Sequence, residues 1–239
     1  MASLIVNVDH VGTLRAADDA AYPDPVAAAI LAELAGADGI GIHVKEDRRE
    51  IKDRDIRILR SVVQNKLVLK MASTPEMAGV ALELKPDLVI LAPEKRDEFS
   101  PEGGLDLMVH KNTIAETVDT LQSSGISVCI FIDPDPDQIK LAHQLDVAMV
   151  EFQTATFCSA FTTIRKKQAF TKIVNAIKLT RKLKISVCAG AGLCYNTIQN
   201  FKGLNEIEMY VIGHSIISRA VLVGMERAVK EMIARIKDL

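Results

Sequence analysis

The sequence has no tryptophan, and Phe, Tyr and Trp together make up only 4% of its 239 residues. It also lacks an excess of charge of either sign, because 29 basic residues stand against 31 acidic ones and the formal net charge is −2. Proteins that bind nucleic acid or anionic membranes through a general basic surface need a positive excess. The composition therefore argues against both kinds of partner.

Paired cysteines and long apolar runs are missing as well. The four cysteines are Cys129, Cys158, Cys188 and Cys194, and their spacing is not that of a zinc site. No apolar stretch approaches the roughly 20 residues that span a bilayer, and the N-terminal segment does not have the pattern of a signal peptide. We therefore expect reduced thiols, no metal site and a cytoplasmic protein.

Short runs rich in β-branched residues alternate along the chain with longer segments of helical spacing. Eight such runs occur, at residues 3–9, 39–44, 66–71, 87–92, 126–132, 147–152, 185–190 and 209–214. The helical segments lie at 24–36, 74–86, 112–125, 135–146, 170–184 and 218–239. Proline and glycine mark helix limits, as Pro25 and Gly36 do for the first of these segments.

Eight strand–helix units over about 240 residues predict an α/β protein of the (β/α)8 type, a TIM barrel. The alternative is a doubly wound open sheet, but the first turn, "NVDHVGT", holds one glycine and lacks the dinucleotide-binding fingerprint. No linker rich in Gly, Ser or Pro divides the chain, which predicts a single domain over residues 1–239. The longer connections 93–112 and 153–170 predict extra helices or loops over one end of the barrel.

Polar side chains gather at the predicted strand ends, where the active sites of such barrels form. Among them are Asn7, Asp9, His10, His43, Lys45, Lys70, Glu94, Lys95, Arg96, Glu151, Gln153 and His214. Alternation along a strand places Asn7 and Asp9 on one face, and it does the same for His43 and Lys45. A glutamate such as Glu151 costs several kcal/mol if it is buried unpaired, so it needs a cation or a ligand.

Simpler structural interpretations remain open for parts of this cluster. A histidine at a strand end is more often structural than catalytic, although His43 shares its level with Asp9, Lys70 and Glu151. Asp9 is also suited to capping the first turn after its strand. The charged segment 45–60 is most simply a solvated helix face.

Two glycine-bearing turns follow the last two predicted strands. They read "CAGAGL" at 188–193 and "IGHSII" at 212–217, and the second runs directly into a helix start. In such barrels, backbone N–H groups and a helix N-terminus at this place bind phosphate. The sequence therefore predicts an anion site, formed by these glycines and the amides of His214 and Ser215, for a small phosphorylated metabolite.

The chain also carries the motifs "NVDHVGTLR", "AYPDPVAAA", "EDRREIKDRD", "PEKR", "FIDPD", "AGAGL" and "IGHSIISRAV". Together, and in this order, they resemble the pyridoxine 5′-phosphate synthase family of vitamin B6 synthesis. The resemblance implies a barrel with extra helices that assembles as a homo-octamer. It also implies a transferase-type condensation of 1-deoxy-D-xylulose 5-phosphate with 3-amino-2-oxopropyl phosphate, which releases phosphate and water and needs no metal or organic cofactor.

The resemblance assigns roles to individual residues. Contacts to the aminoketone phosphate match Asn7, Gly192, Gly213 and His214, and contacts to the deoxyxylulose phosphate match Asp9 and His10. Two further substrate-binding positions are Lys45, in place of an arginine, and Ser100, in place of a threonine. His43 matches a proton-transfer histidine, and Glu151 matches a carboxylate that stabilises charged intermediates.

Four further positions depart from the family pattern. Lys70 stands where the family has a catalytic glutamate and Ala191 where it has a second catalytic histidine, while Asp18 and Glu50 replace an arginine and a histidine. A protonated lysine cannot act as a general base, since it has no lone pair to accept a proton. Carboxylates in place of cations weaken the binding of a phosphate dianion if they point inward.

Three interpretations of Lys70 are open. It pairs with Glu151, Glu94 or Asp9, or it binds a phosphate or carboxylate, or it forms a Schiff base with a carbonyl substrate. Three functions are open as well. The chain is a pyridoxine 5′-phosphate synthase or close paralogue with His43, Lys70 and Glu151 at its catalytic centre, a lysine-dependent lyase or aldolase, or a non-catalytic protein that binds phosphorylated metabolites.

Overall fold

Eight parallel strands close into a barrel in the computed structural model, which describes residues 1–17, 20–94, 98–100 and 102–239. Each strand pairs with its neighbours in chain order, and β8 pairs with β1 to close the sheet. The strands are β1 (Ser3–Asn7), β2 (Gly39–His43), β3 (Lys66–Met71), β4 (Leu88–Leu91), β5 (Val128–Ile132), β6 (Met149–Gln153), β7 (Ser186–Gly190) and β8 (Ile207–Ile212). The predicted (β/α)8 barrel is confirmed.

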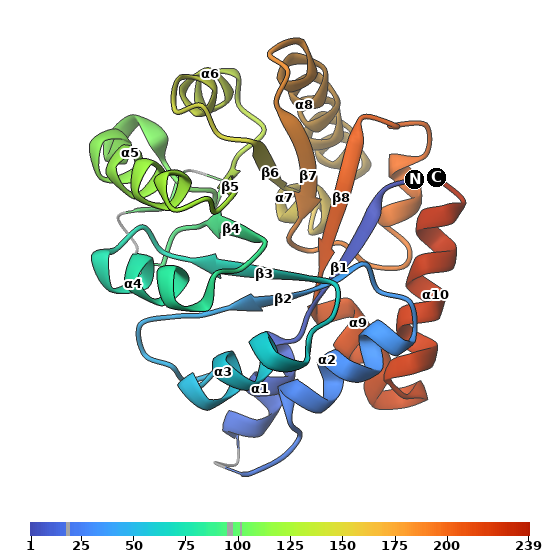
Figure 1. Cartoon of the computed structure of the whole chain (residues 1–239). Helices are drawn as coiled ribbons and strands as arrows, with labels where there is room; N and C mark the ends of the chain where they lie inside the picture. The colour runs from blue at the N-terminus through green and yellow to red at the C-terminus, as the bar shows by residue number, and fades with distance from the viewer. Residues whose placement is uncertain (18–19, 95–97, 101) are drawn as a thin grey trace.

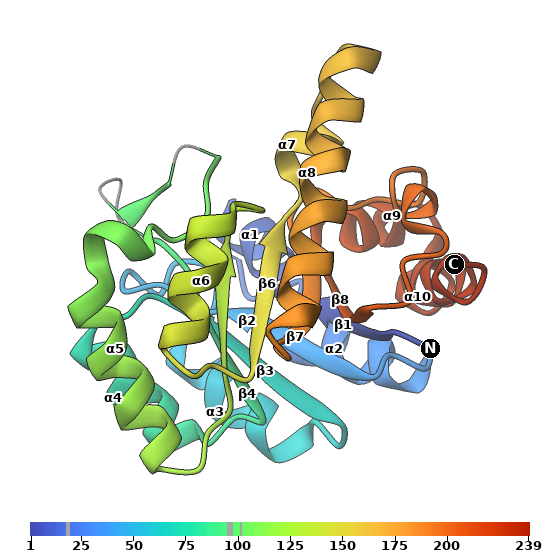
Figure 2. The same ribbon diagram turned by 90° about the horizontal axis from the view of Figure 1, so that it is seen from above.

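Helices surround this barrel on its outer side (Figure 1). They are α1 (Asp9–Ala17), α2 (Pro25–Leu34), α3 (Asp53–Val62), α4 (Pro75–Leu84), α5 (Leu107–Ser123), α6 (Pro136–Gln144), α7 (Ala155–Cys158), α8 (Thr163–Lys182), α9 (His214–Val223) and α10 (Met225–Lys237), with a 3-10 turn, η2 (Ile198–Phe201), before β8. Figure 2 shows α8, which has 20 residues, extending beyond its neighbours, with the short α7 beside it.

The strands are buried on both faces, as a parallel sheet covered by helices requires. Alternate side chains point into the barrel, where Ile5, Val68, Ile90, Cys129, Cys188 and Met209 form an apolar cluster. The opposite faces of the strands pack against the helices in a second and larger cluster. Burial raises the pKa of Cys129 and of Cys188 well above that of an ordinary thiol, so both thiols are protonated at neutral pH.

Two helix starts follow from the signals in the sequence. The Asp24 carboxylate accepts a hydrogen bond of 2.9 Å from the amide of Val26, and Pro25 occupies the first turn of α2. The Thr74 hydroxyl accepts a bond of 3.3 Å from the amide of Met77 at the start of α4. Each cap satisfies an N–H group that the helix itself leaves unpaired.

The first predicted strand is too long. β1 ends at Asn7 and helix α1 begins at Asp9, so strand alternation does not relate these two side chains. Segment 45–52, predicted as part of a solvated helix face, instead forms a loop that packs on α1. A Cβ added at Gly12 would collide with the backbone carbonyl of Glu50, so this close approach requires glycine.

Further boundaries differ toward the C-terminus. Helix α5 begins at Leu107 rather than near 112, and α8 begins at Thr163 rather than near 170. The connection 153–170, for which extra helices or covering loops were predicted, contains α7 and the start of α8. The last predicted helix is two helices, because the chain breaks at Gly224 between α9 and α10. Gly224 has φ of +83°, a conformation that glycine adopts without the steric cost of a side chain.

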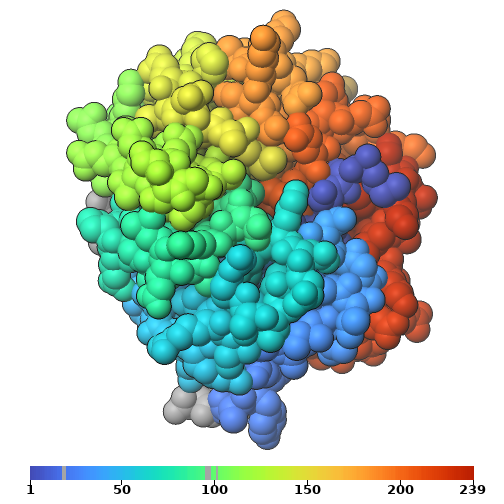
Figure 3. Space-filling view, viewed as in Figure 1, coloured from blue at the N-terminus to red at the C-terminus, as the bar shows by residue number. Residues whose placement is uncertain are grey.

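The two chain ends meet on the amino-terminal side of the barrel strands. The amide of Gly203 donates a hydrogen bond of 2.9 Å to the carbonyl of Leu239. Met1, Ala2 and Leu239 line one small hollow there. Figure 3 shows the N-terminal segment at the surface beside the C-terminal helix. Among the described helices, none has the length and apolar character needed to cross a membrane.

Candidate active site

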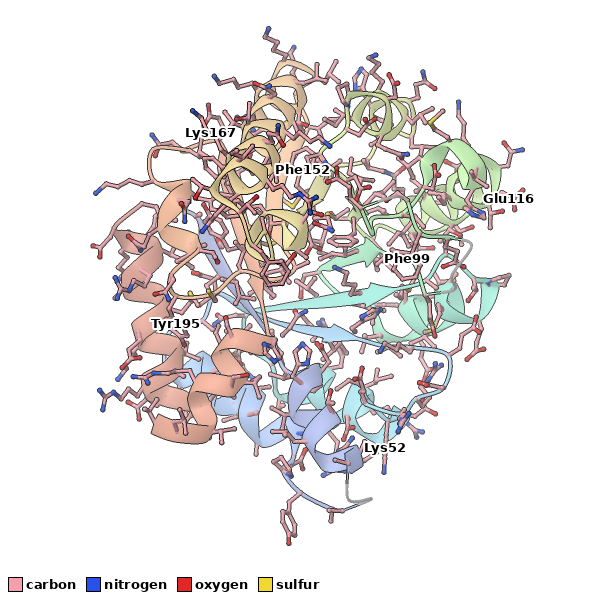
Figure 4. All side chains as sticks on the ribbon, turned by 180° about the vertical axis from the view of Figure 1, so that it is seen from behind. Lys52, Phe99, Glu116, Phe152, Lys167 and Tyr195 are labelled. Carbon is pink, nitrogen blue, oxygen red and sulfur yellow. The ribbon has the colours of Figure 1, made fainter. Side chains whose placement is uncertain are left out.

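A cavity of about 690 Å³ opens at the carboxyl-terminal end of the barrel strands. Strand ends from different parts of the chain reach it, through Asn7 of β1, His43 of β2, Lys70 of β3 and Glu151 of β6. Figure 4, seen from behind the view of Figure 1, labels Phe99, a lining residue from the segment after β4. The structure therefore brings His43, Lys70 and Glu151 into one cavity.

Lys70 and Glu151 form an ion pair across the barrel. The Lys70 Nζ lies 3.3 Å from Oε1 and 3.2 Å from Oε2 of Glu151, and it sits 3.7 Å above the centre of the Phe131 ring. Burial raises the pKa of the Glu151 carboxyl, and the Lys70 charge opposes that rise. Of the three carboxylates considered for Lys70, Glu151 is the one in hydrogen-bond contact.

His43 is held neutral beside this pair. It lies directly opposite Lys70 in the register of β2 and β3. Burial, together with the positive charges of Lys70 and Lys45, lowers its pKa to about 3. Its Nε2 atom is buried and has no hydrogen-bond partner among the described residues. A neutral imidazole with a free nitrogen is able to exchange a proton with a bound substrate.

Asp9, His10 and His214 meet where α1 and α9 begin. The His10 Nε2 lies 3.8 Å from Oδ2 of Asp9, and the rings of His10 and His214 are 5.3 Å apart at a steep angle. Burial raises the pKa of Asp9, and His10 opposes that rise. Asp9 Oδ1 is buried and has no hydrogen-bond partner within the described part of the chain.

Lys45 is also paired, on the other side of the cavity. Its Nζ lies 3.0 Å from Oε2 of Glu50, and the Thr13 hydroxyl donates a bond of 2.8 Å to Oε1 of the same carboxylate. Burial raises the pKa of Glu50, but the bonds from Lys45 and Thr13 outweigh it, so the net shift is downward. Glu50 is thus a charged lining residue that points inward.

The turns after β7 and β8 form the opposite wall of the cavity. Ala191 and Gly192 have φ of +65° and +78°, and helix α9 starts at His214 directly after Gly213. A Cβ added at Gly213 would lie 2.8 Å from Cβ of Asn7, so glycine allows this turn to pack on β1. The first amides of a helix have no partner within it and attract anions. Gly190, in contrast, faces Glu151 rather than the cavity.

Comparison with known proteins identifies the family of the chain. The family model described as "Pyridoxal phosphate biosynthesis protein PdxJ" matches residues 4–238. A pyridoxine 5′-phosphate synthase from Desulforapulum autotrophicum is 55% identical over 239 residues, which is 100% of both chains. The chain belongs to the PdxJ family. Another PdxJ relative, a pyridoxine 5′-phosphate synthase from Geobacter metallireducens, is 52% identical over 99% of both chains.

Solved structures of low identity share the barrel of this PdxJ chain. The structure of KGPDC from Streptococcus mutans has a TM-score of 0.68 at 14% identity and covers 99% of this chain and 97% of that one. A phosphoribosyl anthranilate isomerase from Thermus thermophilus has a TM-score of 0.63 at 11% identity, with 98% of each chain covered. These likenesses support the fold alone.

Not every residue expected to bind substrate reaches the cavity of the PdxJ chain. Ser100 is buried, and its hydroxyl donates a bond of 2.5 Å to Oδ2 of Asp133. It does not line the cavity, whereas Phe99 and Gly103 from the same segment do. Asp18, Lys95 and Arg96 lie outside the described residues.

Sequence reasoning missed several lining residues. Phe131, Asp47 and Cys194 were not singled out, although all three line the cavity. Phe131 could have been predicted as a lining residue, because it occupies an inward position of a predicted strand. Asp47 lies in a loop whose path no periodicity reveals. Among the described residues, no group of three or more His, Cys, Asp or Glu side chains is placed to hold a metal ion.

Proposed function

We propose that the chain carries out the pyridoxine 5′-phosphate synthase reaction, in which 1-deoxy-D-xylulose 5-phosphate and 3-amino-2-oxopropyl phosphate yield pyridoxine 5′-phosphate, phosphate and water. The observation that carries this proposal is the match to enzymes of that name over the whole chain. It is supported by a cavity large enough for two small substrates at the end of the barrel where such chemistry occurs. The reaction is of the transferase type, and we place it in the cytoplasm.

His43 is the proton-transfer group in this proposal. Condensing an amine with a ketone, and then losing water, requires protons to move between nitrogen, carbon and oxygen atoms of the substrates. A pKa of about 3 leaves the His43 ring neutral at physiological pH, with a lone pair on Nε2, and negative charge on a bound substrate would raise this pKa toward the range in which a general base works. Lys70 donates hydrogen bonds and stabilises negative charge on a substrate oxygen, while Glu151 holds it in place.

The phosphate of the aminoketone binds at the turns after β7 and β8. Gly192, Gly213, His214 and Ser215 all line this wall, and α9 directs its N-terminus at the cavity. Asn7 packs beneath Gly213 through its Cβ, and its side-chain amide lies against Gly41 of β2. No carboxylate from this pair of turns competes with the dianion, and the helix dipole favours negative charge there.

A second candidate is a protein that binds these phosphorylated compounds and turns them over very slowly. Lys70, paired with Glu151, is not a general base, and the methyl group of Ala191 cannot transfer protons. A lysine-dependent lyase is less well supported, because an ammonium in an ion pair has no lone pair with which to attack a carbonyl. We therefore expect slow turnover.

The test is to incubate the purified protein with both substrates and to follow pyridoxine 5′-phosphate by mass spectrometry. We expect a low but measurable rate, and a rise of about 10²-fold or more in the double variant Lys70→Glu/Ala191→His, since each positioned acid–base group contributes about 10²–10⁴-fold. Lys70→Glu would place a second carboxyl beside Glu151, so that the two share a proton. Histidine also tolerates the positive φ of Ala191.

A matched control and a decisive outcome complete this test. Asp137→Asn removes a charge from a surface pair with Lys140 on α6 and leaves the cavity untouched, so its rate should equal that of the unmodified protein. Absence of product from both the unmodified protein and the double variant would reject the synthase and leave the binding protein. An ordinary enzymatic rate that Lys70→Ala abolishes would instead make Lys70 a working replacement for the family's glutamate.

A further inference from the structure

The four cysteines fall into two pairs with different surroundings. Cys129 and Cys188 are buried inside the barrel. Cys158 ends α7 and Cys194 follows the turn after β7, and both side chains are half-buried. Cys194 also lines the cavity, so a small molecule that enters the cavity can reach its sulfur.

The thiols of Cys158 and Cys194 contact the same hydroxyl group. The Thr197 hydroxyl lies 3.4 Å from Sγ of Cys194, and it also forms a hydrogen bond with the thiol of Cys158. Sγ of Cys158 lies 3.9 Å from the hydroxyl of Thr154 as well. Since both sulfur atoms touch one oxygen, a short movement of the side chains brings them toward the roughly 2.05 Å of a disulfide bond.

The backbone segments that carry the two cysteines are packed together. A Cβ added at Gly192 would lie 3.0 Å from Cα of Ala155 and 3.1 Å from Cβ of Cys158, so α7 lies directly against the turn after β7. The Thr154 hydroxyl fixes this contact by donating a bond of 2.6 Å to the carbonyl of Ala191. A disulfide needs such close backbones, because its two Cα atoms are about 4.4–6.8 Å apart.

The two thiols differ in reactivity. Burial raises the pKa of Cys158, and the hydrogen bonds of Thr197 and Thr154 offset this rise only in part. Burial also raises the pKa of Cys194, but bonds from the Thr197 hydroxyl and from the amides of Thr197 and Asn196 outweigh it, so the net shift is downward. The thiolate is the reactive form of cysteine, so Cys194 reacts first with an oxidant.

We infer that Cys194 and Cys158 form a redox modification site, in which a peroxide oxidises Cys194 and Cys158 then closes a disulfide with it. The Cys194 thiolate attacks one peroxide oxygen, the O–O bond breaks, and the products are a sulfenic acid and hydroxide. The Cys158 sulfur attacks the Cys194 sulfur, the S–O bond breaks, and the oxygen leaves as water with the proton of Cys158. Two thiols are oxidised to one disulfide and hydrogen peroxide is reduced to two waters, so this chemistry does not depend on the reaction proposed above.

This modification site is linked to the anion-binding wall of the cavity. The Ser215 hydroxyl, in the first turn of α9, donates a bond of 2.9 Å to the carbonyl of Leu193, next to Cys194. A disulfide draws Cys194 toward α7 and therefore displaces the carbonyl that holds Ser215. We expect the disulfide form to bind inorganic phosphate about threefold or more weakly than the reduced form, as measured by calorimetric titration.

The experiment treats the reduced protein with hydrogen peroxide, alkylates the remaining thiols with iodoacetamide in urea, and analyses unreduced tryptic peptides by mass spectrometry. We expect one cross-link, which joins peptide 141–165 with Cys158 to peptide 185–202 with Cys188 and Cys194. Fragment spectra should place the bond at Cys194, and dithiothreitol should remove it. Phosphate binding should recover after this reduction.

Two variants separate the roles of the two thiols. In Cys158→Ser, Cys194 should stop at the sulfenic acid, which dimedone traps. In Cys194→Ser, Cys158 should stay reduced at the same peroxide concentration. Cys129 and Cys188 are the matched control within every sample, because burial keeps both thiols protonated, and they should stay reduced throughout.

A link between Cys158 and Cys194 of one chain is the decisive result. Its absence from the peroxide-treated unmodified protein would overturn the inference, and so would a link between two chains or a link to Cys188. Oxidation of Cys158 in Cys194→Ser as fast as in the unmodified protein would overturn the assigned order. Equal phosphate affinities of the reduced and disulfide forms would overturn the link to the anion-binding wall. The results for the unmodified protein stand even if a variant does not fold.

Discussion

The ion pair of Lys70 and Glu151 is buried in the barrel, since the two side chains are 13% and 1% exposed. Removing two charges from water is costly, and their attraction and hydrogen bonds offset this cost only while both are present. The ion pair therefore adds little net stability to the fold, but replacing one of its two residues alone is costly. A change at Lys70 leaves a carboxylate in the barrel interior, and the protein must either protonate it or lose stability.

The first prediction follows from this constraint. Lys70→Ala should lower the free energy of unfolding by about 3–5 kcal/mol near pH 8 and by clearly less near pH 5. Burial already raises the pKa of Glu151 in the folded protein, and loss of Lys70 removes the influence that opposes the rise. A carboxyl with a raised folded pKa gives its full stability below its unfolded pKa and loses it as pH rises through the folded value. Urea unfolding at the two pH values measures the difference.

A surface pair provides the comparison. Lys140 lies 2.9 Å from Asp137 one turn away on α6, and Lys140→Ala should change stability little at either pH. An equal loss at pH 5 and pH 8 in Lys70→Ala would show that packing on Phe131, rather than the charge of Glu151, dominates the effect.

At the scale of elements, the turn between β8 and α9 requires a residue without a side chain, Gly213. A Cβ on Gly213 would lie 2.8 Å from Cβ of Asn7 and 3.1 Å from the His10 ring. Relief of this contact requires α9 to move away from β1. Because α9 supplies the amides that face the cavity, the position of this helix and the strength of anion binding are coupled.

We therefore predict that Gly213→Ala weakens inorganic phosphate binding by about tenfold or more and destabilises the fold by about 1–3 kcal/mol, the usual cost of overpacking. Gly79→Ala in α4 is the control, since a Cβ there meets nothing within 4 Å and alanine favours a helix. Calorimetric titration with phosphate measures the first effect and thermal unfolding the second. Unchanged phosphate affinity in Gly213→Ala would place the anion elsewhere.

Regular elements were predictable from the sequence, while the loops around the cavity were only partly so. The eight β-branched runs gave the barrel, and from it the meeting of His43, Lys70 and Glu151, because parallel strands end on one side. The loop 45–52 was mistaken for helix, since its alternating charges mimic a solvated helix face. Its path depends on Gly12 and on the Glu50 contacts with Lys45 and Thr13, which join residues distant in sequence.

The predicted boundaries of α1, α9 and α10 were wrong for a related reason. Asp9 continues the polar ending of a strand as naturally as it starts a helix, and a single Gly224 inside a helical pattern is often tolerated. Packing against neighbouring elements decides both boundaries. Helix α1 packs on α2 and β2, and α10 packs on α2. Sequence periodicity does not report such contacts.

At the scale of the whole molecule, the pairing of β1 with β8 joins the two ends of the chain into one sheet. Removing either end would open the barrel and expose the unpaired edges of its neighbours. We propose on this basis that residues 1–239 form one domain that unfolds as a unit.

The outer surface points to self-association. Apolar side chains are exposed on α2 and α9, with Leu34 76% and Leu222 78% exposed, and Leu31 and Val223 line a hollow between these helices and α10. Such a concentration of exposed apolar side chains is typical of an interface. We propose that the protein is a homo-oligomer, and the family resemblance implies an octamer.

Light scattering at micromolar concentration should therefore give a multiple of the 26.1 kDa chain mass. Leu222→Glu should reduce this mass by placing a charge in the interface, whereas Phe161→Glu, at an exposed site between α7 and α8, should not. A monomer mass for the unmodified protein would contradict the proposal, and dissociation by Phe161→Glu alone would move the interface to that side.

The meeting of the two chain ends has a practical consequence. Met1 and Leu239 lie beside each other at the amino-terminal side of the strands, and the cavity opens at the opposite side. A fusion partner or an affinity tag at either end would project away from the entrance to the cavity. The same proximity allows a short peptide to join the ends and new ends to be cut in an exposed connection, so the barrel is suited to circular permutation and to oriented attachment on a surface with its cavity facing the solution.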